Sequence, residues 1–109
     1  MSFKIIAIES FKHQAKKLSK KYPSLKNDIG ELEVSLSNKP DFGIPIGQNC
    51  YKIRLAIKSK GQGKSGGSRV ITNVAIVQNT VFLLSIYDKS EMDNISDLAL
   101  KRLLKQLPD

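Results

Sequence analysis

The chain has 109 residues, of which 40% are hydrophobic and 26% charged, and its formal net charge is +8. This length supports one domain with one hydrophobic core and excludes two, and the apolar fraction excludes a disordered chain. We therefore expect residues 1–109 to form a single domain. The positive charge favours a nucleic-acid partner, because phosphate binding releases counterions. A basic surface that is simply solvated is the alternative.

Cysteine and histidine usage narrows the class of protein further. Cys50 is the only cysteine, which excludes an internal disulfide and suits a reducing cytoplasm. With His13 as the only histidine, the usual four ligands of a structural zinc site are not available, and we expect no metal and no cofactor. The opening MSFKIIAI is too short an apolar run for a signal peptide or a membrane span, so we expect a cytoplasmic protein without membrane contact.

The first half of the chain predicts a strand followed by two helices. Residues 3–8 carry apolar groups on both strand faces, which predicts a strand that is covered on both sides. Ser10 is placed to cap a first helix, and Pro23 separates it from a second. The apolar stripes of the two helices are Phe11, Ala15 and Leu18, and then Leu25, Ile29, Leu32 and Leu36. A helical hairpin that covers one face of a sheet would bury both stripes.

Residues 38–49 contain two prolines and two glycines, so we expect a loop that leads into the central sheet. The stretch that follows, residues 50–58, alternates apolar and basic side chains with the two-residue period of a strand. Between Phe42 and Tyr87 there is no acidic residue. The basic residues in this interval are Lys52, Arg54, Lys58, Lys60, Lys64 and Arg69. A sheet face with cations and no neutralising carboxylates favours an anionic ligand, and we interpret that ligand as RNA.

The glycine-rich turn over residues 59–67 imitates two nucleotide-binding motifs. Gly61, Gly63 and Gly66 have the spacing of the dinucleotide motif, but a β-branched strand follows them where that motif requires a helix. The P-loop is excluded as well, because Lys58 occupies the position of its first glycine. The remaining interpretation is a long, mobile hairpin loop. Its cations, suited to binding a phosphate backbone, are Lys58, Lys60 and Lys64.

The last third of the chain predicts two further strands and a helix. Asn79 tolerates the positive φ of a tight turn, and residues 81–86 are apolar throughout, as in a strand buried on both faces. Ser96 is placed to cap a final helix whose apolar stripe is Leu100, Leu103, Leu104 and Leu107. The sequence therefore predicts an α+β fold. A helical hairpin packs on a small, mainly antiparallel sheet of about four strands, and a C-terminal helix follows.

In order and spacing, four segments carry a resemblance to a known family: KKYPSLKNDI, CYKIRLAI, GKSGGSRVI and LLSIYDKSEMDNIS. The chain resembles a RelE/ParE-superfamily toxin of a type II toxin–antitoxin system, in particular its RelE-like and HigB-like branches. The resemblance implies an endoribonuclease that cleaves mRNA, usually in the ribosomal A site, and thereby inhibits translation. It also implies a small cognate antitoxin, often one with a DNA-binding segment.

The resemblance also implies site residues. The RelE pattern places two cations on one strand, an arginine at the start of the next and a cation just after the third, and these positions match Lys52, Arg54, Arg69 and Lys89. RelE-type toxins often have a tyrosine near the start of the last helix. This chain has Asn94, Ile95 and Ser96 there, and Tyr87 is the nearest phenol.

The chemistry of RNA cleavage is consistent with these residue types. The substrate's own 2′-hydroxyl is the nucleophile, so the protein must orient the attack, move protons and neutralise charge on the phosphate. The planar fork of arginine binds two phosphate oxygens, which suggests Arg69 as the main stabiliser and Arg54 as a second clamp. A lysine among other cations can act as a base, which suggests Lys52, while Lys89 or Tyr87 would assist the leaving oxygen.

Two other functions fit the same fold and charge. One is a ParE-like poison of DNA gyrase without ribonuclease activity, and the missing tyrosine favours it. The other is a non-catalytic basic RNA-binding module, for which the aromatic stacking residues are sparse on the basic strand. For Lys52 and Arg54 the alternative is that they only form the solvent-exposed face of an amphipathic strand and have no role in binding.

Overall fold

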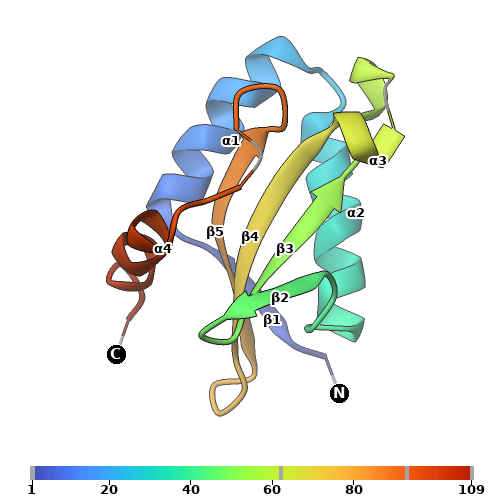
Figure 1. Cartoon of the computed structure of the whole chain (residues 1–109). Helices are drawn as coiled ribbons and strands as arrows, with labels where there is room; N and C mark the ends of the chain where they lie inside the picture. The colour runs from blue at the N-terminus through green and yellow to red at the C-terminus, as the bar shows by residue number, and fades with distance from the viewer. Residues whose placement is uncertain (1, 62, 93, 109) are drawn as a thin grey trace.

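The computed structural model describes residues 2–61, 63–92 and 94–108. The chain combines helices and one sheet in an α+β arrangement (Figure 1). In order they are β1 (Lys4–Ala7), α1 (Glu9–Lys21), α2 (Leu25–Asn38), β2 (Ile44–Gly47), β3 (Cys50–Leu55), the 3₁₀ turn η1 (Lys58–Lys60), α3 (Gly63–Gly66), β4 (Ser68–Ala75), β5 (Thr80–Asp88) and α4 (Asp97–Leu104).

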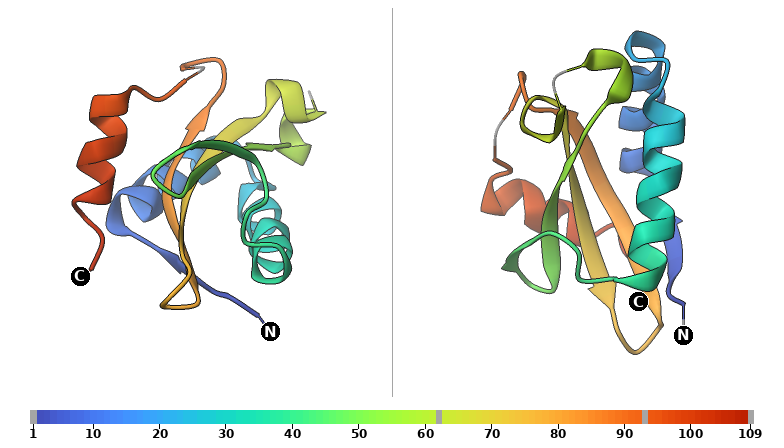
Figure 2. Two further views of the ribbon diagram at one scale, coloured as in Figure 1. Left: turned by 60° about the horizontal axis from the view of Figure 1, so that its bottom comes forward. Right: turned by 90° about the vertical axis from the view of Figure 1, so that its right-hand side faces the viewer.

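The strands form one five-stranded sheet in the order β1-β5-β4-β3-β2. β1 runs parallel to β5, and the other neighbours are antiparallel. Helices α1 and α2 cover one face, and α4 lies on the other side of the sheet (Figure 2). The predicted fold class is confirmed, with one strand more than expected.

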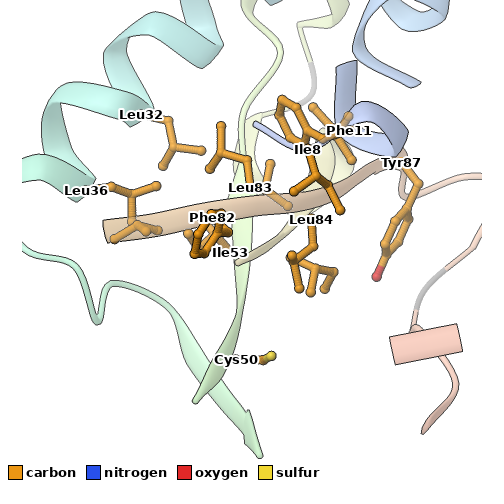
Figure 3. Packing of buried hydrophobic residues seen from close by; sticks show 14 of the residues in the cluster. Ile8, Phe11, Leu32, Leu36, Cys50, Ile53, Phe82, Leu83, Leu84 and Tyr87 are labelled. Carbon is orange, nitrogen blue, oxygen red and sulfur yellow. The ribbon is translucent and has the colours of Figure 1, made fainter. Parts of the chain in front are cut away.

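The core lies between the helical hairpin and the sheet. Leu25 and Leu36 of α2 are fully buried, as their helical spacing predicts. Every residue of β5 is buried, which confirms the prediction for residues 81–86. Figure 3 shows Phe11 of α1 on one side of β5, and Leu84 and Tyr87 on the other. β5 is therefore the central strand of the molecule, with side chains packed on both of its faces.

The prediction that the first strand is covered on both sides is wrong. β1 lies at the edge of the sheet, where half-buried and exposed side chains alternate. Ile6 is 45% exposed, and Lys4 is exposed as well. The helical hairpin covers one face of this short edge strand and leaves the other open to solvent.

The predicted loop over residues 38–49 contains the strand that sequence reasoning missed. β2 pairs with β3 through Ile44 opposite Lys52 and Pro45 opposite Tyr51, and a register shift follows before Gly47. The proline and the glycines favoured a loop. Proline has no backbone N–H to donate to a neighbouring strand. On an edge strand that position can face solvent, so an edge strand tolerates proline.

Side chains of α1 close the edge of β5 beyond the reach of β1. The Ser10 hydroxyl donates to the Leu84 carbonyl at 3.0 Å, so Ser10 is not the predicted helix cap, and α1 begins at Glu9. The Oε1 atom of Gln14 accepts from the Ile86 amide at 3.1 Å and from the Ser85 hydroxyl at 3.0 Å. β1 pairs only with the N-terminal half of β5. In the C-terminal half, these side-chain hydrogen bonds take the place of the bonds that a neighbouring strand would make.

Two local predictions in the last third of the chain are confirmed. Asn79, in the turn between β4 and β5, has a φ of +52°. The Ser96 hydroxyl accepts from the Ala99 amide at 3.1 Å and caps α4. These short-range signals hold because the hydrogen bond and the turn geometry depend only on neighbouring residues.

Candidate active site

Cross-strand register brings three predicted catalytic residues into one row. Arg54 of β3 lies directly opposite Arg69 of β4, and Arg69 lies directly opposite Tyr87 of β5. Directly paired residues project from the same face of a sheet, with their Cβ atoms about 4.5–5.5 Å apart. Lys52 precedes Arg54 by two positions and therefore shares this face. Figure 3 shows Tyr87 on the side of β5 away from α1, so this row faces away from the helical hairpin. We call Lys52, Arg54, Arg69 and Tyr87 the basic row.

The two β3 residues of the basic row are more exposed than its β4 and β5 residues. Arg54 is exposed and Lys52 half-buried, whereas Arg69 is 3% and Tyr87 6% exposed. The Arg69 guanidinium donates to the Ser68 carbonyl oxygen at 3.2 Å. An anion from solvent therefore meets Arg54 first, and Arg69 lies beneath the surface.

The chain between β5 and α4 reaches the basic row. The Lys52 ammonium donates to the Asn94 side-chain carbonyl at 2.6 Å, a contact between residues 42 positions apart in the sequence. Asn94 stands in the segment where the family pattern has its tyrosine. The structure thus places an amide next to the candidate base. In the sequence, Asn94 stood out only because it replaces the tyrosine of the family pattern. Nothing in the sequence indicated its hydrogen bond to Lys52.

Lys89, the fifth predicted catalytic residue, follows β5 directly and is exposed. The Lys89 backbone amide donates to the Gly67 carbonyl at 3.1 Å. Gly67 directly precedes β4 and lies two positions before Arg69 in the sequence. Asp88, which precedes Lys89 in the sequence, directs its carboxylate to Lys60.

The glycine-rich turn differs from the predicted plain loop, because it contains η1 and α3. The Lys58 ammonium contacts the Glu31 carboxylate at 2.9 and 3.1 Å, and this hydrogen bond and charge raise the pKa of Lys58. The Lys60 ammonium contacts Asp88 at 2.8 Å. The expectation that no carboxylate neutralises the cations of this stretch is therefore wrong for Lys58 and Lys60. The side chain of Lys64 lies outside the described part of the structure.

The buried Asp88 is the centre of a polar cluster on the helical side of the sheet. Its Oδ1 atom accepts from Lys60 Nζ at 2.8 Å, the Ser90 amide at 2.9 Å and the Ser90 hydroxyl at 2.8 Å. Its Oδ2 atom accepts from the Tyr22 hydroxyl at 2.8 Å. Burial alone raises the pKa of the Asp88 carboxyl, but the hydrogen bonds from Lys60, Ser90 and Tyr22 outweigh it and hold this pKa well below its ordinary value. We call these four residues the Asp88 cluster.

A hollow of about 280 Å³ adjoins the exposed end of the basic row. Its lining consists of Phe42, Gly43, Ile44, Lys52 and Arg54. Because Ile44 pairs directly with Lys52, the Ile44 side chain projects from the same face as the two cations. The missed strand β2 thus places the apolar side chain of Ile44 next to the predicted phosphate-binding residues.

Within residues 2–61, 63–92 and 94–108, no group of three or more His, Cys, Asp and Glu side chains is arranged to hold a metal ion. No helix in the same ranges is long and apolar enough to cross a membrane.

A sequence model of the family described as "RelE toxin of RelE / RelB toxin-antitoxin system" matches residues 3–107. The chain belongs to this RelE toxin family. The match covers the basic row, the Asp88 cluster and all the helices and strands, so the predicted family resemblance is confirmed.

Solved structures of RelE share the fold at low sequence identity. A free Escherichia coli RelE with two arginines changed to alanine matches with a TM-score of 0.66 and 17% identity, covering 99% of this chain and 100% of that one. The same mutant in complex with a peptide of the antitoxin RelB matches with a TM-score of 0.63, 17% identity and the same coverage. The isolated E. coli RelE toxin matches with a TM-score of 0.57 and 20% identity, covering 97% of this chain and 100% of that one.

Proposed function

We propose that this RelE-family toxin is a metal-independent endoribonuclease that cleaves mRNA during translation and thereby inhibits protein synthesis. The observation that carries the proposal is the basic row. Three strands hold Lys52, Arg54, Arg69 and Tyr87 on one face of the sheet. Arg54 and Arg69 are directly opposite each other, and directly opposed like charges repel across a sheet. A phosphate group of RNA bound beside both cations would be attracted to both of them.

The proposed reaction uses the nucleophile of the substrate. The RNA 2′-oxygen forms a bond to phosphorus while the bond from phosphorus to the 5′-oxygen breaks, which leaves a cyclic phosphate and a free 5′-hydroxyl. Lys52, once neutral, accepts the proton of the 2′-hydroxyl, and Tyr87 or Lys89 donates one to the departing 5′-oxygen. Arg54 and Arg69 stabilise the charge that develops on the phosphate oxygens.

The burial of Arg69 and Tyr87 adds a requirement to this reaction. A phosphate reaches the exposed Arg54 directly, whereas contact with Arg69 requires the surrounding side chains to move. We propose that substrate binding includes this rearrangement, and that Lys52 and Arg54 form the first encounter with the RNA backbone. The binding energy of the RNA would drive the movement.

We also propose a cognate antitoxin protein as the natural partner of this chain, one with the DNA-binding segment that the family pattern implies. Family membership supports the partner, and E. coli RelE has been solved with a peptide of its antitoxin RelB. A net charge of +8 favours an acidic antitoxin segment, because complementary charge speeds association and selects the partner.

The experiment that tests the function is induced expression without the antitoxin, followed by mapping of RNA 5′ ends. We expect discrete cuts within translated messages, and about tenfold or more loss of cutting in Arg54→Ala, which removes one phosphate clamp. Lys26→Ala is the matched control, because Lys26 is an exposed cation on α2, away from the basic row. We expect this control to cut like the wild type.

Intact RNA in cells arrested by the wild-type chain would contradict the proposal. If broken DNA accumulated with gyrase attached, the result would favour the ParE-like alternative instead. Equal cutting by Arg54→Ala and wild type would remove Arg54 from the site.

A further inference from the structure

The hollow next to Lys52 and Arg54 combines two kinds of surface. Lys52 and Arg54 supply positive charge to its lining, and Phe42 and Ile44 supply apolar surface. Ile44 is 50% exposed, so its apolar side chain is open to a ligand directly beside Lys52. The strand register fixes this neighbourhood, because Ile44 and Lys52 are a directly opposed pair.

The backbone beneath the hollow is closely fitted and admits only glycine. Gly43 has a φ of +111°, and a Cβ atom at this position would lie 2.8 Å from both Ile53 Cγ1 and the Lys52 carbonyl oxygen. Glycine therefore lets the segment before β2 lie close against β3, with no Cβ to collide with Ile53 and the Lys52 carbonyl. Phe42 is half-buried and packs against the core, so the apolar wall of the hollow is anchored.

A nucleotide matches this combination of surfaces, since it joins a flat, weakly polar base to an anionic phosphate. Proteins bind single-stranded RNA through cations along the backbone and apolar or aromatic surface against the bases. The volume of about 280 Å³ is just below the range of about 300–1,000 Å³ that holds drug-sized ligands, which suits a single base. We propose that this hollow binds one nucleobase of the RNA substrate, adjacent to the phosphate held by Arg54.

This base site deepens the proposed function and rests on it for the nature of the ligand. Arg54 and Lys52 contact the backbone, which every RNA sequence shares, so they position the strand without selecting it. Phe42 and Ile44 contact the base, and they are therefore the residues that determine which nucleotide is preferred next to the scissile phosphate. The start of β2 and the residues just before it would then determine the base specificity of the toxin.

Binding of an uncleavable RNA tests the hollow apart from catalysis. The probe is a short 2′-O-methyl oligonucleotide, which lacks the attacking hydroxyl, and it is compared with an otherwise identical strand that is abasic at one position. We expect Ile44→Ala to bind the complete strand about three- to tenfold more weakly, because the smaller side chain covers less of the base. Its affinity for the abasic strand should equal that of the wild type. Ile44→Trp should bind the complete strand more tightly, because an aromatic ring stacks on bases.

Val34→Ala is the matched control, because Val34 is a 64% exposed aliphatic residue on α2, on the other side of the sheet. We expect its affinity for both strands to be unchanged. In the cleavage assay, Ile44→Ala should broaden the base preference at one position beside the cut, whereas Arg54→Ala should slow cutting at all sites. The two variants thus separate base selection from phosphate binding.

The outcomes distinguish this inference from the proposed function. If the wild type cuts RNA but Ile44→Ala keeps both the affinity and the cutting pattern, the base site is wrong and the ribonuclease stands. If the wild type cuts no RNA but Ile44→Ala loses affinity for the complete strand alone, the base site stands and the catalytic function fails. If Ile44→Ala weakens antitoxin binding and leaves RNA binding unchanged, the hollow is a protein contact and the inference is overturned.

Discussion

The two faces of the sheet use the cations of one short stretch in opposite ways. On the helical side, Lys60 is paired with the buried carboxylate of Asp88 and lies 5.7 Å from the ring centre of Tyr22. On the other side, Arg54 and Arg69 stand opposite each other, next to Tyr87. Tyr87 and Asp88 are neighbours in the chain, and strand geometry alone directs them to opposite faces.

This difference shows that a count of local charges does not decide which cations are available to a ligand. The interval from Phe42 to Tyr87 lacks carboxylates, yet Glu31 and Asp88, from outside it, fold onto Lys58 and Lys60. We therefore assign Lys60 to the stability of the fold and Arg54 to binding. Changes on the Asp88 side should alter the free energy of unfolding, and changes on the basic row should alter RNA cleavage.

The largest expected effect is on activity, in Arg69→Ala. Removing the main phosphate stabiliser should lower the single-turnover cleavage rate about 100-fold or more. Arg69→Lys keeps the charge but cannot bind two phosphate oxygens at once, so it should recover only part of the rate. The rate is measured on programmed ribosomes at a temperature well below the melting transition of each variant. If a folded Arg69→Ala variant cleaved RNA as fast as the wild type, the proposed role of Arg69 in phosphate stabilisation would be wrong.

The next effect is on stability, in Asp88→Asn. Loss of this buried charge leaves Lys60 without its partner, and we expect the free energy of unfolding to fall by about 3 kcal/mol at pH 7. Because the folded-state pKa of Asp88 is lowered, its stabilisation is fully present above the ordinary carboxyl pKa of about 3.9 and is lost as the pH falls further. The difference between wild type and variant should therefore narrow from about pH 4 downward.

Urea denaturation between about pH 7 and pH 3 measures this difference. Asp41→Asn, at an exposed carboxylate on the loop after α2, is the matched control and should leave stability unchanged. A constant difference between wild type and Asp88→Asn across the whole pH range would contradict the role given to the ionised carboxylate.

The smallest effect is expected for Glu31→Gln, which breaks the second ion pair of the same turn. The side chains of Lys58 and Glu31 are 66% and 64% exposed, so water and salt already screen their attraction. The free energy of unfolding should change by no more than the error of the urea measurement, and less at high salt than at low salt. If Glu31→Gln lowered the free energy of unfolding as much as Asp88→Asn does, exposure would not explain the difference between the two ion pairs.

Patterns that depend on neighbouring residues predicted most of the fold. The two-residue period of β3 placed Lys52 and Arg54 on one face, and the helical spacing of Leu25 and Leu36 marked their burial. The Ser96 cap is equally local, because the hydroxyl and the amide it binds are three residues apart. The shared face of Arg54, Arg69 and Tyr87 also depends on the register between the strands, because a one-residue slip moves a side chain to the opposite face.

Features that depend on distant segments were not predictable from these patterns. The ion pairs of Lys58 and Lys60 join residues 27 and 28 positions apart, and the contact between Lys52 and Asn94 spans 42. β2 was missed because Pro45 is a poor strand residue everywhere except at an edge, and the edge is a property of the whole sheet. The burial of Arg69, which is 3% exposed, is likewise a property of the folded chain and not of its neighbours in the sequence.

The hydrogen bonds that Ser10 and Gln14 make to β5 have a consequence for self-association. An apolar strand with a bare edge is a template on which another chain can add, and this is a common start of aggregation. By occupying the Leu84 carbonyl and the Ile86 amide, α1 denies that template to a second molecule. The chain can therefore keep a largely apolar strand at its centre, because side chains from 74 and 72 positions earlier block intermolecular pairing along this part of its edge.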